Sequence, residues 1–238
     1  MPRMLLCLAA AAASLPALAA PAKAAPVGGG LDVTGGVTLV SDYRFRGISF
    51  SDEDPAIQGT INIAHDSGFY IGTWASSIED SPAFGHTEID LYGGWAGEVA
   101  PGTSLDVGIT YYVYPNGNDA FGPSDFFEPY AKLSHTLGPV EATVGAYYAW
   151  SQSAIGDADN LYLFTDAAAA IPGTPLTLKG HAGWSEGSLA PTGDYFDWSL
   201  GVDAAVGPVT VGLAYVDTDL GNVHTLDAGL VLSIGAAF

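Results

Sequence analysis

The sequence predicts an all-β protein, a transmembrane antiparallel up-and-down β-barrel of about 12 strands. Three observations predict this fold. Apolar residues alternate along segments separated by turns, short turns alternate with long loops, and no charged residue is forced onto an apolar strand face. In such a barrel hydrocarbon covers the outer face, while the backbone hydrogen bonds close around the ring.

Glycine (31) and proline (15) punctuate the chain, and the segments between them have strand length. Strongly periodic helical stretches are absent, and no stretch of about 18 apolar residues predicts a transmembrane helix. Twelve segments are predicted as strands: 33–46, 57–65, 69–77, 87–96, 105–114, 126–136, 140–150, 160–170, 176–184, 195–205, 209–216 and 225–237.

Alternation assigns an outer face to most of these strands. The first strand presents Val37, Leu39, Tyr43 and Phe45, and the fourth presents Ile89, Leu91 and Trp95. The fifth presents Leu105, Val107, Ile109, Tyr111 and Val113, and the tenth presents Phe196, Trp198, Leu200, Val202 and Ala204. The eighth strand, 160–170, is ambiguous because of its alanine run, so its facing stays open.

The last strand shows the alternation most clearly. Every second residue from Leu226 to Ala236 is apolar, and the sequence ends on Phe238. A water-soluble protein has no reason to expose such a face, whereas a barrel in lipid does. A terminal aromatic at this place also resembles the assembly signal of bacterial outer-membrane barrels, so Phe238 predicts recognition by the outer-membrane assembly machinery.

The connections alternate in length. Short turns are predicted at 66–68, 97–102, 138–139, 171–175 and 207–208, and longer polar loops at 47–56, 78–86, 115–125, 151–159, 185–194 and 217–224. Outer-membrane barrels have short periplasmic turns and longer external loops. The order therefore predicts a barrel with both termini in the periplasm.

The aromatic residues suggest two girdles at the membrane interfaces. Most fall near strand ends that border a long loop: Tyr43, Phe45, Trp74, Tyr111, Tyr112, Tyr114, Phe126, Phe127, Tyr130, Tyr147, Tyr148, Trp150, Tyr162, Phe164, Trp184, Tyr195, Phe196, Trp198 and Tyr215. Phe69, Tyr70, Trp95 and Phe238 lie near the other rim. The alternative is packing within the core of a β-sandwich, which would spread the rings along strand centres.

The N-terminal residues 1–24 are predicted to be a secretory signal peptide, cut within 19–25, and residues 25–238 form the barrel domain. Arg3 precedes an apolar stretch that is too short to span a bilayer, and small residues follow it. Cys7 lies in the signal, so the mature chain has no cysteine for disulfides or thiolate metal sites.

The mature chain is strongly acidic. The whole sequence has 26 acidic and six basic residues. Two of the basic residues, Arg3 and Lys23, belong to the predicted signal peptide and are absent from the mature chain. Nucleic acid is excluded as a partner because phosphate binding needs clustered Lys and Arg. The acidic excess indicates affinity for cations, or only a soluble, repelling surface.

The residues opposite the apolar positions face the lumen, and these are the predicted pore-lining residues: Asp42, Arg44, Arg46, Glu88, Asp90, Asp106, Glu128, Lys132, Glu141, Lys179, His181, Asp197, Asp203 and Asp227. They suit two roles equally. One is a structural network of ion pairs, and the other is a ring of fixed charge that selects ions or solutes. Acids outnumber bases among them, which favours cations.

Other chemistry finds weaker support. Asp52-Glu53-Asp54 and Asp157-Ala158-Asp159-Asn160 could bind a hard cation, but neither has the spacing of a calcium loop. No metal site and no cofactor is predicted. A barrel hydrolase would need a serine and histidine such as Ser134 with His135 or His224. No G-x-S-x-G elbow occurs, and neighbouring residues on a strand face opposite ways. The protein is therefore predicted not to be an enzyme.

Residues 41–49, Ser-Asp-Tyr-Arg-Phe-Arg-Gly-Ile-Ser, resemble the start of the TorF family of proteobacterial outer-membrane proteins. The resemblance continues through 54–59, 65–77, 88–94 and 111–115, and it is sharpest over 41–115. It implies a porin-like barrel in the outer membrane of a Gram-negative bacterium, but it supplies no substrate.

Together these observations predict a porin in contact with outer-membrane lipid that passes small hydrophilic solutes passively and favours cations. One alternative is a barrel enzyme that resembles a lipid hydrolase. The others are a barrel with a structural or adhesive role and a soluble secreted β-sandwich. The permeant, the pore width, an inward-folded loop and the oligomeric state stay open.

Overall fold

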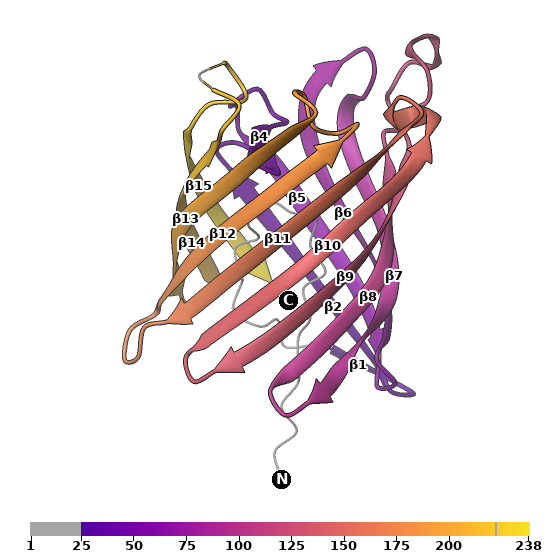
Figure 1. The fold of residues 1–238 in the computed structure, drawn as a ribbon. Coiled ribbons are helices and arrows are strands. Elements are labelled where there is room, and N and C mark those ends of the chain that lie inside the picture. The colour runs from indigo at the N-terminus through magenta and orange to yellow at the C-terminus, as the bar shows by residue number, and fades with distance from the viewer. Residues whose placement is uncertain (1–24, 222) are drawn as a thin grey trace.

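The computed structural model describes residues 25–221 and 223–238, and these form a closed antiparallel β-barrel (Figure 1). Its wall has 12 strands, as predicted: β2 (Leu31–Val40), β5 (Ala56–His65), β6 (Phe69–Ser81), β7 (Gly85–Ala100), β8 (Thr103–Val113), β9 (Phe126–Leu137), β10 (Val140–Gln152), β11 (Ala158–Ala170), β12 (Leu176–Gly187), β13 (Asp194–Val206), β14 (Val209–Thr218) and β15 (Gly229–Ala237).

Each strand of the wall pairs with the next one along the chain, and the first and last strands close the ring. β15 pairs with the second half of β2, from Ser233 opposite Val40 to Ala237 opposite Gly36. Phe238 extends this pairing through backbone hydrogen bonds with Gly35. A short strand, β1 (Ala25–Gly28), pairs with the first half of β2, which β15 does not reach.

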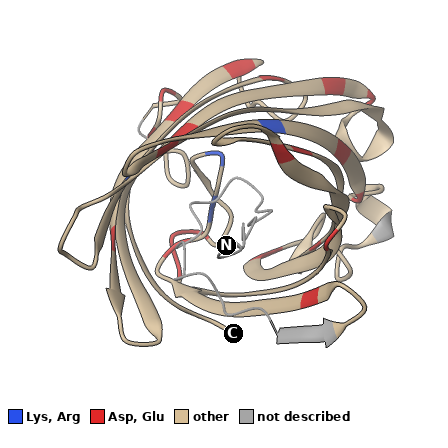
Figure 2. Ribbon diagram, turned by 90° about the horizontal axis from the view of Figure 1, so that it is seen from below, with Lys and Arg blue, Asp and Glu red and all other residues tan. Residues whose placement is uncertain are grey.

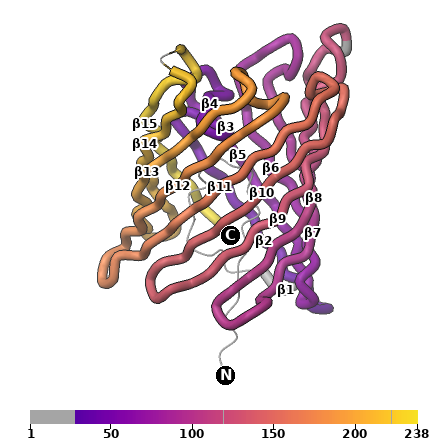
Figure 3. The backbone as a smooth tube through the Cα atoms, viewed as in Figure 1, coloured from indigo at the N-terminus to yellow at the C-terminus, as the bar shows by residue number. Residues whose placement is uncertain are grey.

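The two rims differ as predicted (Figure 3). One rim carries the tight turns 66–68, 101–102, 138–139, 171–175 and 207–208. β2 begins and β15 ends at this rim. The other rim carries the connections 41–55, 82–84, 114–125, 153–157, 188–193 and 219–228. Three of these, 82–84, 153–157 and 188–193, are tighter than predicted because the strands beside them extend beyond their predicted ends.

The short helical turns η1 (Asp119–Phe121) and η2 (Ser153–Ile155) lie in two of the longer connections. Within the described part of the chain, no helix is long and apolar enough to cross a membrane. The predicted signal peptide, residues 1–24, lies outside the described residues.

Strand pleating sends the apolar residues outward. Ile71, Leu200 and Leu230 are 62%, 69% and 70% exposed, although each lies within a strand. On the other face many side chains are polar and buried, as with Asp90, which lies inside beside the outward-facing Leu91. The ambiguous strand β11 follows the same rule, with Leu163 exposed and Tyr162 buried. This inverted burial is the arrangement of a membrane barrel.

Two predicted strands are several residues too long at the long-loop rim. The first strand, predicted as 33–46, ends at Val40, and the last begins at Gly229 rather than at residue 225. Tyr43 and Phe45, which were assigned to the outer face, are therefore not on the wall at all. They are 1% and 9% exposed inside the barrel.

Candidate functional site

The chain between β2 and β5, residues 41–55, folds into the lumen. We call it the inner segment. It contains a small hairpin of β3 (Arg44–Phe45) and β4 (Ile48–Ser49), whose tip is Arg46-Gly47. Figure 2 looks along the barrel and shows a segment with basic residues inside the ring of strands. Asp42, Arg44 and Arg46 thus lie in the lumen, as predicted, but on this segment rather than on a strand.

The hairpin tip crosses the lumen. In the ring order, β9, β10 and β11 lie opposite β2, where the inner segment begins. Arg46 Nη2 donates to both carboxylate oxygens of Glu128 on β9, each at 2.7 Å. Its guanidinium carbon lies 4.3 Å from the ring centre of Tyr162 on β11 and 5.7 Å from that of Tyr147 on β10. Three consecutive strands of the far wall therefore hold one side chain.

The pocket around Arg46 is fully enclosed. Arg46 is 1% exposed and Glu128 is 0% exposed. Tyr112 on β8 donates to Glu128 at 3.0 Å, and Tyr195 on β13 donates to the backbone oxygen of Arg46 at 3.0 Å. Burial lowers the pKa of the Arg46 guanidinium, but Glu128 beside it raises that pKa above its ordinary value. The pair is therefore ionic.

Arg44 stabilises the hairpin from within. Its Nε donates to Asp42 at 2.5 Å, and its Nη1 donates to the backbone oxygens of Gly47 and Asp227. Asp42 also accepts a hydrogen bond from Ser49 at 2.6 Å. The contact at Asp227, in the connection between β14 and β15, ties the inner segment to the wall beside β2. This places the predicted residue Asp227 next to Arg44.

The carboxylates Glu88 and Asp90 lie side by side on the inner face of β7, as predicted, and are 0% and 1% exposed. Tyr43 of the inner segment donates to Glu88 at 3.1 Å. Burial, with Coulombic contributions from Glu88 and Asp90, raises the pKa of the Tyr43 hydroxyl well above its usual value, so it remains a donor. In the described part of the chain, neither Glu88 nor Asp90 has an ion-pair partner.

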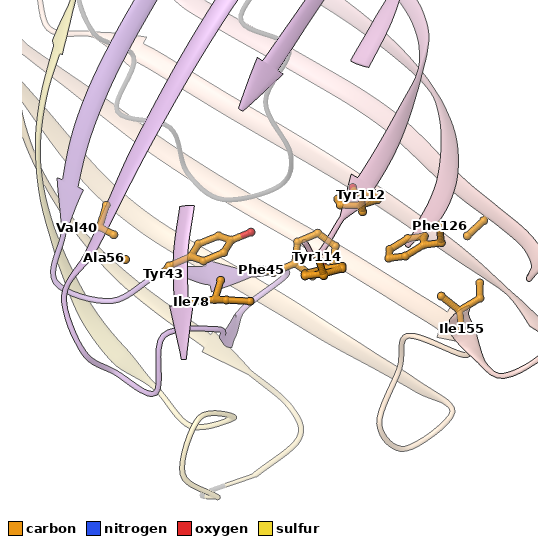
Figure 4. Close-up of a cluster of buried hydrophobic side chains, with 10 residues drawn as sticks. Val40, Tyr43, Phe45, Ala56, Ile78, Tyr112, Tyr114, Phe126 and Ile155 are labelled. Atoms are coloured by element: carbon orange, nitrogen blue, oxygen red, sulfur yellow. The ribbon is translucent and has the colours of Figure 1, made fainter. Parts of the chain in front are cut away.

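Aromatic rings fill the space around the inner segment (Figure 4). Tyr43 and Phe45 of the segment pack among Tyr112, Tyr114 and Phe126 of the wall. The Phe45 and Tyr112 ring centres are 6.0 Å apart in an edge-to-face arrangement. Each such pair contributes about 0.5–1.5 kcal/mol beyond its buried area. Packing and the Arg46–Glu128 pair together hold the segment across the lumen.

The girdle prediction is half right. Tyr111, Phe127 and Trp150 stack in sequence on the outer face of β8, β9 and β10 near the long-loop rim. Phe127, Tyr148, Trp150, Phe196, Trp198 and Tyr215 are all more than a third exposed. The prediction is wrong for rings that lie in the lumen or pack against the lumen clusters: Tyr43, Phe45, Tyr70, Trp74, Tyr112, Tyr114, Phe126, Tyr130, Tyr147, Tyr162, Phe164 and Tyr195.

A second polar network lies on β11, β12 and β13. His181 Nδ1 contacts Asp166 at 2.6 Å, and His181 Nε2 contacts Asp197 at 2.9 Å. The Tyr162 hydroxyl lies 2.8 Å from His181 Nε2, so this network adjoins the Arg46 pocket. His181 and Asp197 were predicted, and Asp166 was missed because the facing of its strand was open.

The remaining predicted residues lie toward the short-turn rim. Lys132 lies 3.9 Å from Asp106, which also accepts a hydrogen bond from Tyr70. Lys179 donates to Asp203 at 3.1 Å. Glu141, the second residue of β10, is exposed and belongs to neither network. Every basic residue of the wall therefore faces an acid.

The serine and the histidines weighed for hydrolase chemistry have separate partners. Ser134 contacts Thr143 at 2.7 Å, whereas His135 contacts Thr103 at 2.8 Å, so this pair does not meet. His224 is exposed and contacts Asp52 and Glu53 at 2.9 and 3.4 Å. Within the described residues, no group of three or more His, Cys, Asp or Glu has the geometry to hold a metal ion.

Gly47 at the hairpin tip provides a first test of this packing. Its φ is +83°, and a Cβ there would lie 2.5 Å from Thr218 Cγ2 and 2.8 Å from Asp197 Cβ. Gly47→Ala is therefore expected to release the segment, since the steric conflict adds about 1–3 kcal/mol to the backbone strain. Limited trypsin digestion in detergent micelles measures the release as cleavage after Arg44 or Arg46.

The matched control is Gly156→Ala, because Gly156 has a φ of +79° but nothing within 4 Å of its Cβ position. This variant shares the backbone strain without the contact, and we expect it to resist trypsin as the wild type does. Equal cleavage of the two variants would show that the tip is not packed against Thr218 and Asp197.

Comparison with solved structures finds the same fold. The KdgM porin, solved in complex with disordered oligogalacturonate, aligns with a TM-score of 0.57 at 6% identity, over 87% of this chain and 97% of the porin. The COG4313 outer membrane channel from Pseudomonas putida F1 aligns at 0.56 and 11% identity, over 90% and 96%. A Pseudomonas aeruginosa FadL homologue aligns at 0.53 and 10% identity, over 90% and 76%.

No curated protein matches the sequence. A family model does match it: residues 23–235 fit Gcw_chp, which is described as a bacterial protein of unknown function. The match covers nearly the whole barrel, including the inner segment and every wall strand. The chain therefore belongs to the Gcw_chp family, with the fold of an outer-membrane β-barrel.

Proposed function

We propose that this protein is an outer-membrane channel for small hydrophilic solutes, that it favours cations, and that the inner segment narrows its lumen. The observation that carries the proposal is the placement of ionisable side chains. Glu88, Asp90 and Glu128 are enclosed within a barrel whose outer face is apolar. Of these, Glu128 is paired with Arg46, whereas Glu88 and Asp90 lie outside the ion pairs of the described residues.

Similar proteins support the proposal. The KdgM porin and the COG4313 channel share this fold and are named as outer-membrane channels. The resemblance of residues 41–115 to the TorF family points to the same location, the outer membrane of a Gram-negative bacterium. The short-turn rim, with β2 beginning and β15 ending there, would then face the periplasm.

Charge balance favours cations. The lumen bases Arg44, Arg46, Lys132 and Lys179 each lie beside an acid. These contacts support an ion-pair network for the four bases, and they leave Glu88 and Asp90 outside it. Fixed negative charge in a low-dielectric lumen attracts cations and repels anions.

Selectivity is tested by the reversal potential of purified protein in a planar bilayer under a KCl gradient. We expect the sign of a cation-selective channel. The double variant Glu88→Gln/Asp90→Asn should shift the potential toward zero, whereas Asp157→Asn in an exposed external loop should leave it nearly unchanged. Anion selectivity would contradict the charge argument, and a barrel that never conducts would contradict the channel itself.

A further inference from the structure

We infer that the far wall of the lumen is a binding site for organic cations that carry a guanidinium or primary ammonium group, with the Arg46 side chain as its built-in occupant. A free solute of this class would compete with Arg46 for the site and release the inner segment. This inference rests on the proposed channel function and names the class of solute that the channel recognises.

The wall around Arg46 has the chemistry of a cation site. A carboxylate, Glu128, faces the guanidinium at 2.7 Å, and the rings of Tyr162 and Tyr147 lie 4.3 and 5.7 Å from its carbon. A carboxylate with aromatic faces is how proteins hold guanidinium and ammonium groups, since Coulombic and cation–π attraction act together. These three groups come from the wall strands β9, β10 and β11. A further ring, Phe45 at 4.7 Å from the guanidinium carbon, belongs to the inner segment itself.

Arg46 satisfies this site incompletely. Its Nε and Nη1 atoms are buried without a hydrogen-bond partner, so only Nη2 pairs with the carboxylate. A guanidinium can donate to a carboxylate from two nitrogens at once, but Arg46 donates to Glu128 from one nitrogen only. The tether prevents the Arg46 guanidinium from presenting two nitrogens to Glu128. A free guanidinium can take the two-nitrogen orientation, and it therefore competes well with Arg46 for the carboxylate.

The backbone indicates that the tether is under strain. Arg46 has a φ of +50°, in the left-handed region that non-glycine residues rarely adopt. Strain of this kind is found at ligand clamps and switch regions. The strain is independent of the pocket chemistry, and it disappears when the segment is released.

Unmatched acids adjoin the site. Asp90 lies opposite Tyr112 in the register of β7 and β8, and Tyr112 donates to Glu128. Glu88 interacts with Tyr43, Tyr114 and Asp90, whereas neither carboxylate oxygen of Asp90 receives a hydrogen bond from an N–H donor. A buried carboxylate left without a donor is costly. A solute with several N–H donors could supply what the protein does not.

The test uses methylguanidinium, the head group of arginine, and methylurea as its neutral counterpart of similar shape. Titration calorimetry in micelles should show saturable binding of methylguanidinium to Arg46→Ala. Binding to the wild type should be at least ~10-fold weaker, because a short tether keeps its own group at a millimolar effective concentration. Methylurea should bind neither protein.

Two variants control for charge and for the wall. Arg46→Ala/Glu128→Gln should lose the binding, and Lys179→Ala, which removes an equal charge beside Asp203, should not gain it. Heat-modifiable gel migration confirms that each barrel is folded. Absent binding in folded Arg46→Ala, or binding that survives Glu128→Gln, would overturn the inference.

The wild type gives a second measurement that needs no variant to fold. Methylguanidinium should raise its conductance in a planar bilayer, whereas methylurea should not. If the wild type conducts KCl but methylguanidinium changes neither its current nor the calorimetry of Arg46→Ala, the cation site is wrong and the channel stands. If none of the barrels conducts while methylguanidinium still binds, the channel is wrong.

Discussion

Arg46→Ala is expected to convert a mostly narrowed barrel into a mostly open one. The substitution leaves Glu128 buried without its cation and removes the cation–π contacts with Tyr162 and Tyr147. Breaking a buried ion pair costs about 3–5 kcal/mol. At about 1.4 kcal/mol per tenfold change, the equilibrium between the docked and the released inner segment moves by at least ~100-fold.

Single-channel recording in a planar bilayer measures this shift as a larger main conductance or a longer open time. Glu128→Gln should act in the same direction, since it removes the same ion pair from the other side. Lys179→Ala changes the lumen charge by the same amount as Arg46→Ala but does not touch the inner segment. If Lys179→Ala opens the barrel equally, charge rather than release of the segment controls the current.

The sequence predicted the wall well because one physical rule fixes it. Each strand crosses an apolar medium, so alternation marks both the strand and its facing, as Leu91 and Asp90 show on β7. Strand β11, whose facing the sequence left open, obeys the same rule, with Leu163 outside and Tyr162 inside.

The same rule misplaced the inner segment. Asp42, Tyr43, Arg44, Phe45 and Arg46 alternate polar and aromatic residues, which is also the pattern of a strand. What folds them inward is a set of partners on distant strands, Glu88 and Glu128 above all, and pairing across the lumen leaves no local trace in the sequence. Single-sequence periodicity cannot detect it.

The tyrosines were misjudged for a related reason. An amphipathic ring suits a lipid interface and a polar lumen equally well. Tyr112 could still have been placed correctly, because it alternates with Tyr111 and Val113, which were assigned to the outer face of the same strand. Facing by parity is therefore the better guide than residue type for aromatic residues in a barrel.

Leu213→Arg is expected to cost the barrel about 2–4 kcal/mol, the penalty for a basic residue on the lipid face near the bilayer midplane. Leu213 lies in the middle of β14, is 47% exposed and pairs with Leu232 on β15. Urea unfolding in lipid vesicles measures the loss of stability. Leu213→Met keeps the side chain apolar and should cost less than about 1.5 kcal/mol.

The neighbouring residue tests the facing itself. Ala214 points inward by parity and lies opposite Gly201 and Val231 in the register. Ala214→Arg places the same charge in the same part of the strand but on the lumen side, where water and the lumen acids receive it. It should cost less than Leu213→Arg. An equal loss of unfolding free energy at the two positions would mean that the outer face of β14 does not contact lipid. That result would contradict the membrane barrel.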